Sequence, residues 1–546
     1  MTGEAQTTHA GVIAEVGEAP ASPAGPAEAR AYTVIKPKTR AIGATSAVAL
    51  WGLSGTVIAV EASINNGLPG IDIVGLPDAS VSEARKRVRA AVSNVGLSLS
   101  AQRITVNLSP GSVKKAGTAF DLSIAVALLA AEGAVNRDAA ASCVCIGELG
   151  LDGRLHPVNG VLPMVSALRK EGLRRVIVPK ANESEALLAG DVDVRGCISL
   201  ADAVRVLGGD VRPVDLVPVE LSGRRAVEPQ RPGDLADVQG QDDARWALEV
   251  AAAGGHHLLM SGPPGAGKTM LAGCLPGLLP TLSPDEAVEA CSLQSLDGTF
   301  DPEQGLAAVP PFESPHHRTT AAAMVGGSKP GMIGVLSKAH RGVLFLDEAP
   351  EFSRDVLEAM RQPLESGVCS IHRAWGSVDL PAQFQLVLAA NPCPCGGSTG
   401  RQCMCSPTEK RRYRAKLSGP LMDRVDIQLT VQPISPADLH RKEKREGSAE
   451  VAQRVARARR VQAERYSTEG FSLNARAPGS RLREIFRFTP QETAHLDTAL
   501  ERGTLSMRGY DRVLRIAATI ADLRGMERPG RDELMAAAAL RTQEQL

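Results

Sequence analysis

The stretch SGPPGAGKTM, residues 261–270, has the residue types and spacing of a loop that binds phosphate groups. An apolar run, LLM at residues 258–260, leads into it, which predicts a strand, a tight loop and the start of a helix. In that arrangement backbone N–H groups point at anionic oxygens, Lys268 reaches the β- and γ-phosphates and Thr269 binds Mg²⁺. The predicted ATP-binding residues are Gly262, Pro263, Pro264, Gly265, Ala266, Gly267, Lys268 and Thr269. The alternative is a glycine-rich turn before an amphipathic helix, and the complete GxxxxGKT pattern argues against it.

Two later apolar runs place polar side chains where a bound nucleotide would meet water. Asp347 and Glu348 follow the run GVLFL, and Asn391 follows FQLVLAA. Runs this short are typical of strands buried in a parallel sheet, whose carboxyl ends face the ligand crevice. Asp347 is therefore predicted to hold Mg²⁺ together with Thr269. Glu348 is predicted to polarise the attacking water, and Asn391 to orient that water or touch the γ-phosphate. Each residue alone could be an ordinary strand end, but their order after a phosphate loop favours catalysis.

Cysteines and basic residues follow Asn391 closely. The spacing CxCx₇CxC can give a tetrahedral zinc site that fixes the loop, although structural sites usually separate each pair by at least two residues. Four reduced thiols are the alternative. The next charged side chains can neutralise DNA phosphates or form a solvated helix face. The cysteines are Cys393, Cys395, Cys403 and Cys405, and the basic residues are Lys410, Arg411, Arg412, Arg414 and Lys416.

A β-hairpin is predicted between the apolar runs that end at Asp347 and at Asn391. The segment SRDVLEAMRQPLESG predicts one helix, and VCSIHRAWGSVDLPAQ after it is typical of a hairpin with its tip near Trp375 and Gly376. Arg373 could contact a phosphate, and Trp375 could stack on a base or act as a wedge between strands. The alternative is a tryptophan buried against a neighbouring sheet.

Composition limits the classes of protein that remain. A chain of 546 residues is too long for one core, so about three domains are expected. Lys and Arg (61) balance Asp and Glu (61), so any nucleic-acid contact must use a local patch. Ten cysteines do not make a disulfide scaffold in a chain of this size. No apolar run has the roughly 18 residues of a membrane helix, and no signal peptide is evident. We expect a cytoplasmic protein without membrane contact.

Composition shifts predict how the chain is divided. The first residues are rich in Ala, Pro, Gly and Glu and cannot bury enough apolar surface to offset the entropy of ordering. The predicted parts are a disordered tail (1–40), a first folded block (41–210), a proline-rich linker (211–233), the nucleotide block (234–432), a charged linker (433–449) and a helical block (450–546).

Two elements can be predicted inside the first folded block. It opens with strand-like alternation in GTVIAVEASINNGLPGIDIVG. A helix is expected over DASVSEARKRVRAAVSNVG, capped by Asp78, Ser80 or Ser82 and ended by Gly96.

From Asp234 onward the chain resembles the magnesium-chelatase-like branch of AAA+ ATPases. With the first block included, it resembles the ComM/YifB family over nearly all residues after 40. The resemblance is carried by VQGQDDARWALEVAAAGGHHLLMSGPPGAGKT, PHHRTTAAAMVGG, GVLFLDEAPEF, LAANPCPCGG, LSGPLMDRVDIQ and SMRGYDRVLRIAATIADL. It implies an α/β fold, with an AAA+ P-loop parallel sheet and a helical lid preceded by a smaller α+β domain. It also implies a ring, normally a hexamer, that uses ATP and Mg²⁺ to drive branch migration of DNA during recombination or natural transformation.

The resemblance assigns roles to two arginines. Arg424, in MDRVD, matches an arginine finger that acts on a neighbouring subunit's nucleotide, and a surface pair with Asp423 or Asp426 is the alternative. Arg508, in SMRGYDR, matches the arginine of the helical lid, with Arg512 as the second candidate. Either lid arginine could simply cover the surface.

The first block resembles the Lon-protease-like version of the ribosomal protein S5 fold through IGELGLDGRLHPVNGVLPMVSALRKEGLRRVIVPKANESEA. Peptide hydrolysis there needs a serine activated by a lysine. The matching positions are Ala119 and Leu162, which cannot do that chemistry. Ser123 and Lys115 lie nearby in the sequence but are not offered as a substitute pair. We therefore expect a non-catalytic module for ring assembly or DNA contact.

Three functions compete on this basis. The first is a DNA-translocating ATPase, the second is a magnesium chelatase subunit that inserts metal into a porphyrin, and the third is an ATP-gated scaffold. The first block argues against a chelatase subunit, which is not expected to carry one. The complete set of Lys268, Asp347, Glu348, Asn391 and Arg424 argues against a scaffold.

Overall fold

The computed structural model describes seven stretches of the chain: 42–220, 232–327, 332–373, 376–396, 403–417, 419–435 and 445–541. The tail expected over 1–40 and the hairpin-tip residue Trp375 lie outside the described residues. Among the described residues, no helix combines the length and the apolar character needed to cross a bilayer.

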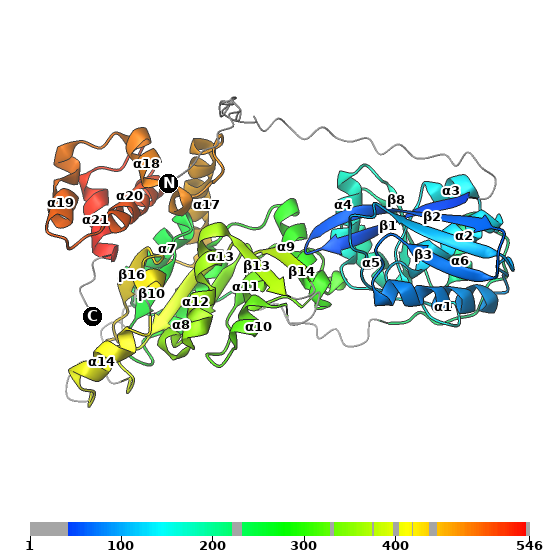
Figure 1. The fold of residues 1–546 in the computed structure, drawn as a ribbon. Coiled ribbons are helices and arrows are strands. Elements are labelled where there is room, and N and C mark those ends of the chain that lie inside the picture. The colour runs from blue at the N-terminus through cyan, green and yellow to red at the C-terminus, as the bar shows by residue number, and fades with distance from the viewer. Residues whose placement is uncertain are drawn as a thin grey trace, which may run out of the picture. The chain divides into compact units, whose positions relative to one another are not determined.

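The first block is built on a seven-stranded mixed sheet with the order β3-β4-β2-β1-β5-β8-β9 (Figure 1). Side chains alternate between its faces: Ala47 and Ala49 of β1 pack with helices α1, α2 and α6, while Val48 packs with α4 and α5. The strands are β1 (Ile42–Trp51), β2 (Ser54–Asn65), β3 (Gly70–Val74), β4 (Arg103–Ser109), β5 (Val144–Cys145), β8 (Arg175–Pro179) and β9 (Asp193–Cys197), with β6 (Glu148–Leu149) and β7 (Leu155–His156) forming a separate pair. The helices are α1 (Ala79–Asn94), α2 (Asp121–Glu132), α3 (Arg137–Ala141), α4 (Val161–Lys170), α5 (Glu183–Leu187) and α6 (Leu200–Val206).

The beginning of this block differs in part from expectation. The helix over DASVSEARKRVRAAVSNVG is confirmed as α1, and Asp78 is its cap, because its Oδ1 accepts a hydrogen bond from the Val81 N–H at 2.8 Å. The expectation that the block opens at GTVIAVEAS is wrong. A full strand, β1, comes first and pairs antiparallel with β2. Its inward residues include Gly43, Thr45 and Ala47, which are too small to give a clear apolar alternation.

The second block contains a five-stranded parallel sheet with the order β11-β12-β15-β10-β16. Its strands are β10 (Leu258–Ser261), β11 (Phe312–Glu313), β12 (Val343–Leu346), β15 (Gln385–Ala390) and β16 (Ile427–Thr430), and the hairpin is β13 (Val368–Arg373) with β14 (Gly376–Pro381). The helices are α7 (Asp242–Gly254), α8 (Lys268–Leu278), α9 (Pro284–Asp297), α10 (Ala321–Val325), α11 (Val335–Lys338), α12 (Arg354–Ala359), α13 (Arg361–Ser366), α14 (Pro407–Arg414) and α15 (Gly419–Met422).

The prediction of a single helix over SRDVLEAMRQPLESG is wrong. The segment forms two helices, α12 and α13, that meet at Met360. Pro363 explains the break, because proline lacks an amide hydrogen and its ring clashes with the carbonyl four residues earlier. The predicted hairpin is confirmed, with β13 and β14 antiparallel and Arg373 paired with Gly376.

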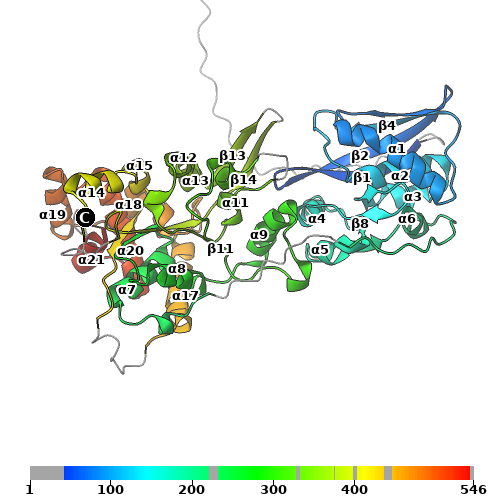
Figure 2. The same ribbon diagram turned by 90° about the horizontal axis from the view of Figure 1, so that it is seen from below.

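The C-terminal helices share one hydrophobic core with a face of the parallel sheet. Helix α17 lies beside α7 and α8 (Figure 2), α20 packs on α7, and α21 packs on α20 and β16. These helices are α17 (Ser448–Arg465), α18 (Gly479–Phe486), α19 (Pro490–Glu501), α20 (Met507–Leu523) and α21 (Arg531–Arg541).

Candidate functional site: a nucleotide site at the sheet edge

The parallel sheet brings the predicted nucleotide residues to one edge. Ser261 pairs with Ala390 at the carboxyl ends of β10 and β15, so the phosphate loop and Asn391 leave the sheet side by side. Gly265 and Gly267 have φ of +77° and +89°, a conformation that side chains rarely adopt, and a Cβ at either would meet nothing within 4 Å. The loop therefore has space in front of it, at the N-terminus of α8, where main-chain N–H groups attract anions.

Lys268 begins α8 and folds back over the loop. Its Nζ donates to the carbonyls of Gly262 at 2.7 Å and Pro263 at 3.0 Å, and to Asn391 Oδ1 at 3.1 Å. The residue is only 8% exposed. Burial lowers the pKa of the Lys268 ammonium, and the nearby carboxylates of Asp347 and Glu348 oppose that shift.

Thr269 and Asp347 supply a pair of oxygen atoms beside the loop. The Thr269 hydroxyl donates to Asp347 Oδ2 at 2.8 Å, and Asp347 Oδ1 accepts from the Glu348 N–H at 2.9 Å. Mg²⁺ prefers hard oxygen ligands such as a hydroxyl and a carboxylate. The sequence predicted both residues, and the structure brings them into contact.

Glu348 follows β12 in an unusual backbone conformation. Its φ of 51° and ψ of 43° lie in the left-handed region, which costs of order 1 kcal/mol for a residue with a side chain and is found often at functional sites. Its carboxylate oxygen Oε2 lies 3.4 Å from His317 Nδ1. The sequence reasoning missed His317, although the residue stands in the quoted PHHRTT motif. That loop segment has no helical or strand periodicity from which the orientation of the His317 ring toward Glu348 could be predicted.

Arg424 and Arg508 lie together and apart from the phosphate loop. They line a cavity of about 320 Å³ with three further arginines, and no residue of 261–270 is in its lining. Arg424 forms an ion pair with Glu365, and Arg508 lies 3.4 Å from Asp423 with 73% of its side chain exposed. The other arginines in the lining are Arg476, Arg512 and Arg515. The lining also contains three carboxylates, those of Glu365, Asp426 and Asp511, so the arginines exceed the acidic residues by two.

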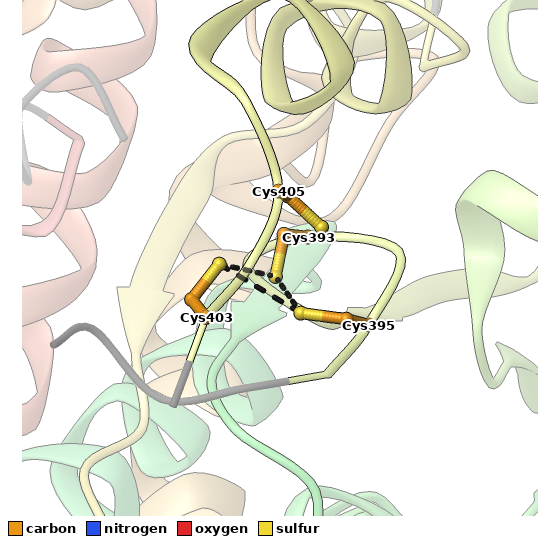
Figure 3. A group of neighbouring side chains, drawn as sticks. All are labelled: Cys393, Cys395, Cys403 and Cys405. Carbon is orange, nitrogen blue, oxygen red and sulfur yellow. Dashed lines mark hydrogen bonds between the residues drawn. The ribbon is translucent and has the colours of Figure 1, made fainter. Parts of the chain in front are cut away.

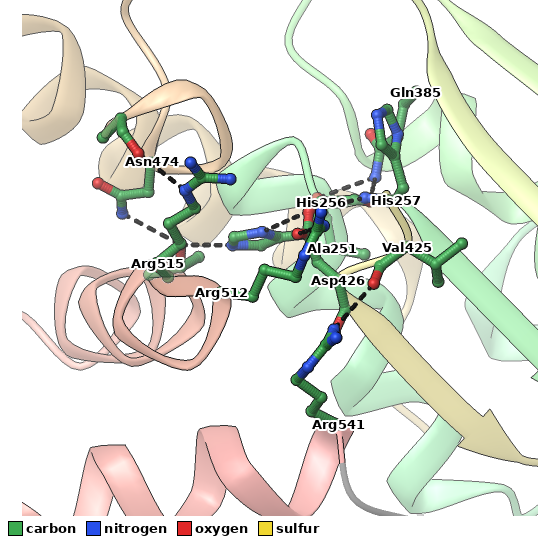
Figure 4. Close-up of polar contacts among 12 residues, drawn as sticks. Ala251, His256, His257, Gln385, Val425, Asp426, Asn474, Arg512, Arg515 and Arg541 are labelled. Carbon is green, nitrogen blue, oxygen red and sulfur yellow. Dashed lines mark hydrogen bonds and ion pairs between the residues drawn. The ribbon is translucent and has the colours of Figure 1, made fainter. Parts of the chain in front are cut away.

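Arg512, the second candidate for the lid role, has a structural partner instead. Its Nη1 lies 2.7 Å from Asp426 Oδ1, and both residues are buried (Figure 4). Burial alone would raise the pKa of Asp426, but the hydrogen bond with His256 and the Arg512 charge outweigh it and hold that pKa below its usual range. Arg541 also donates to the carbonyl of Val425 at 3.0 Å. These contacts tie α20 and α21 to Val425 and Asp426, the two residues between Arg424 and β16.

The hairpin and the basic run have surroundings that the sequence did not predict. Trp51, at the end of β1, donates from Nε1 to the carbonyl of Ser377 in β14 at 2.6 Å, so the first block touches the hairpin. Arg373 is the last residue of β13. The basic run forms α14 and the turn after it, where Arg411 and Arg412 are exposed.

Comparison with known proteins identifies the chain. The profile described as magnesium chelatase, subunit ChlI, matches residues 234–439, that described as subunit ChlI of Mg-chelatase matches 60–182, and its C-terminal counterpart matches 445–541. Uncharacterized protein YifB of Escherichia coli is 39% identical over 91% of this chain and 96% of its own length. Competence protein ComM of Haemophilus influenzae is 39% identical over 87% of this chain and 92% of its own. The chain belongs to the ComM/YifB family. An uncharacterized protein of Mycobacterium tuberculosis (strain H37Rv) is 46% identical to this ComM/YifB chain over 92% of its residues and 99% of the relative.

Membership confirms the expected magnesium-chelatase-like AAA+ fold and makes this ComM/YifB chain an ATP-binding protein. It also weakens one earlier argument. The first block was expected to separate the chain from chelatase subunits, yet residues 60–182 match a profile that carries the chelatase name. The presence of this block therefore does not discriminate between the two functions.

The first block of the ComM/YifB chain is Lon-like. Lon protease of Mycolicibacterium smegmatis is 29% identical over 178 residues, 31% of this chain and 23% of the protease. Leu162, the residue expected at the position of the lysine, is fully buried in α4. Ser123 donates its hydroxyl to the carbonyl of Phe120 at 2.8 Å, and Lys115 donates to the carbonyl of Pro110. Both polar groups are thus satisfied by nearby main chain.

Proposed function

We propose that this chain is an ATP-hydrolysing ring motor that acts on DNA and promotes branch migration in homologous recombination or natural transformation. The observation that carries the proposal is the separation of Arg424 and Arg508 from the phosphate loop. Their cavity contains no residue of 261–270. An arginine finger so placed acts on a neighbour's nucleotide, and a head-to-tail interface that closes gives a ring. A hexamer is the assembly that the family resemblance implies.

The residues at the sheet edge fit ATP with Mg²⁺. The hydroxyl of Thr269 and the carboxylate of Asp347 would hold the metal, and the open loop above Gly265 and Gly267 admits a phosphate chain. When bound, Mg²⁺ neutralises charge on the phosphate oxygens. Lys268 Nζ lies within the phosphate loop, where it donates to the carbonyl of Gly262. With a nucleotide bound, it would donate to the β- and γ-phosphates instead of to the loop carbonyls.

Hydrolysis is assigned to Glu348 and Asn391. Glu348 accepts the proton of the attacking water, and His317 restrains its carboxylate from the neighbouring loop. Asn391 lies in the same site, because its Oδ1 accepts a hydrogen bond from Lys268. Its amide is assigned to orienting the water beside the γ-phosphate. Arg424 from the next subunit stabilises the charge that develops on the transferred group.

DNA is proposed as the substrate on two grounds. The family includes a relative whose name is competence protein ComM. Arg373 ends β13, Trp375 follows it in the sequence, and α14 presents exposed Arg411 and Arg412. Aromatic and basic side chains of this kind stack on bases and neutralise phosphates. Contact between Trp51 and β14 gives the first block a role in supporting the hairpin.

Metal insertion into a porphyrin is the second candidate, because all three matching profiles carry the name magnesium chelatase. The relative named competence protein, which aligns over 87% of this chain, favours DNA instead.

The two candidates are separated by ATPase rates measured without nucleic acid and with single-stranded, duplex or four-way-junction DNA. The proposal predicts that DNA raises the rate, most with branched substrates. A rate that ignores every DNA but rises with a porphyrin and Mg²⁺ would establish the chelatase function. A rate unaffected by either would leave an ATP-gated scaffold.

A further inference from the structure

Four cysteine thiols converge in the segment between Asn391 and α14 (Figure 3). Their sulfur atoms all lie within 4.8 Å of one another. Cys393 Sγ is 3.2 Å from Cys395 Sγ and 3.5 Å from Cys403 Sγ, and Cys395 Sγ is 3.7 Å from Cys403 Sγ. The fourth member of the cluster is Cys405. None of the four is in a disulfide, and Cys393 is buried.

This spacing suits a tetrahedral metal better than a disulfide. Four sulfurs at about 2.3 Å from a central Zn²⁺ lie about 3.8 Å apart, close to the observed separations. A disulfide would need sulfurs at about 2.05 Å. The chain has six other cysteines, all buried, and none of them belongs to a described metal-ligand group. The convergence is therefore a property of this loop alone among the described residues.

The cluster joins elements of the nucleotide site. Cys393 comes two residues after Asn391, and Cys405 directly precedes Ser406, the N-cap of α14. Tyr413 of α14 is buried and hydrogen bonded to the main chain of Asn391. On the other side the loop touches the phosphate loop, because a Cβ at Gly396 would lie 2.8 Å from Pro264 Cγ.

We propose that Cys393, Cys395, Cys403 and Cys405 bind one zinc ion, which holds the segment between Asn391 and α14 against the phosphate loop. Each thiol releases its proton to solvent on binding, and the Zn²⁺ with four thiolates carries a net charge of about −2, with no change of oxidation state. The metal is structural, since four protein ligands leave no open position for water or substrate.

In this proposal the metal holds the four cysteines of the segment in place. Between its cysteines the segment is rich in Gly, Ser and Thr and offers few apolar side chains to a core. A closed metal site supplies the ordering energy that burial cannot. Loss of zinc is then expected to displace Asn391, which precedes Cys393 by two residues, and Pro264, which lies against Gly396.

The first test is metal analysis of the full-length chain purified under reducing conditions without added metal. We expect about one zinc ion per chain. Cys393→Ser and Cys403→Ser should each lower this content at least severalfold, while Cys197→Ser, which changes a buried thiol of the first block, should retain it. Wild-type chain that holds no zinc and gains none from added ZnCl₂ would overturn the proposal. Full zinc content in both cluster variants would also overturn it.

Spectroscopy on the wild-type chain covers the case in which a variant fails to fold. Exchange of the metal for Co²⁺ should produce the visible bands of a tetrahedral site with thiolate charge-transfer absorption. Bands typical of octahedral oxygen coordination would contradict the four-cysteine ligand set.

The effect of zinc on the position of the phosphate loop is measured by the affinity of the chain for a fluorescent ATP analogue. This experiment rests on the proposed ATP site. Chelation of zinc should weaken binding by roughly 10-fold, within the 10²-fold that a 1 Å misplacement can cost. Readdition of ZnCl₂ should restore it. Unchanged affinity after complete zinc removal would refute the coupling to the phosphate loop. Failure of wild type to bind the analogue even with zinc present would instead refute the proposed ATP site.

Discussion

The first block and the nucleotide block both place helices against a sheet, but they differ in what stands at the positions where chemistry would occur. In the Lon-like block the residues expected at those positions are Ala119 and the fully buried Leu162. In the nucleotide block such positions hold polar residues in mutual contact, with Lys268 bonded to Asn391 and Thr269 bonded to Asp347. Helices packed on a sheet therefore do not by themselves carry an activity, which depends on a few side chains at strand and helix ends.

A buried carboxylate of the first block has a structural role. Glu185 of the first block is fully buried and accepts hydrogen bonds from the Leu162 N–H at 3.1 Å and from the Ser295 hydroxyl of α9. This carboxylate holds two parts of the fold together. By contrast, Glu348 and Arg508 are largely exposed, at 50% and 73% of their side chains, and can still meet a ligand.

The largest expected effect comes from Arg424. Arg424→Ala should lower ATP turnover by roughly 10³-fold or more, the range for loss of an arginine finger. Steady-state phosphate release measures this. The control is a mixture of Arg424→Ala and Lys268→Ala subunits, in which some interfaces combine an intact loop with an intact finger. Recovery of activity in the mixture supports action between subunits, and no recovery at any ratio contradicts it.

Glu348→Gln comes next. A missing general base should lower turnover by roughly 10² to 10⁴-fold while ATP binding is retained. The measurement pairs hydrolysis rates with equilibrium binding of the nucleotide. Undiminished hydrolysis would remove Glu348 from its role, and loss of binding as well would indicate a structural one.

Asp426 tests the attachment of the C-terminal helices. Asp426→Ala leaves Arg512 buried without its partner and should destabilise the fold by about 3 to 5 kcal/mol, measured by denaturant unfolding. The folded-state pKa of Asp426 is depressed, so its contribution is present above the unfolded value of about 4 and is lost as the pH falls below it. Asp426→Asn should reduce the loss of stability that the wild type shows as the pH falls. A variant with wild-type stability and acid response would contradict the role given to this ion pair.

The smallest effect belongs to the first block. Ser123→Ala removes one hydrogen bond to the Phe120 carbonyl and should cost about 1 kcal/mol of stability or less, with ATP turnover unchanged. Peptide hydrolysis should be absent from wild type and variant alike. Peptidase activity in the wild type that Ser123→Ala abolishes would reverse the contrast between the two regions.

Much of the nucleotide site could be predicted because its residues follow apolar runs in a fixed order. Lys268, Asp347 and Asn391 each stand directly after a short run or its loop, and a parallel sheet brings such ends to one edge. The sequence could not predict that His317 reaches Glu348, because that contact joins two irregular segments far apart in the chain. It could not place Arg508 beside Arg424 either, since that depends on how α20 packs across the sheet.

In two other places the sequence pattern did not predict the element that the structure contains. Strand β1 was missed because its inward residues are small, and the break at Met360 was missed because a continuous helical period runs through Pro363. The four cysteines were recognised as candidates, but only their three-dimensional convergence supports one common metal.

The central claim is that ATP cleavage drives movement of DNA, and a gel assay of branch migration tests it most directly. A labelled four-way junction is incubated with the chain and ATP, beside Glu348→Gln and a sample with a non-hydrolysable nucleotide. We predict conversion of the junction to forked products by wild type alone. Equal conversion in all three samples, or none by an actively hydrolysing wild type, would contradict the claim.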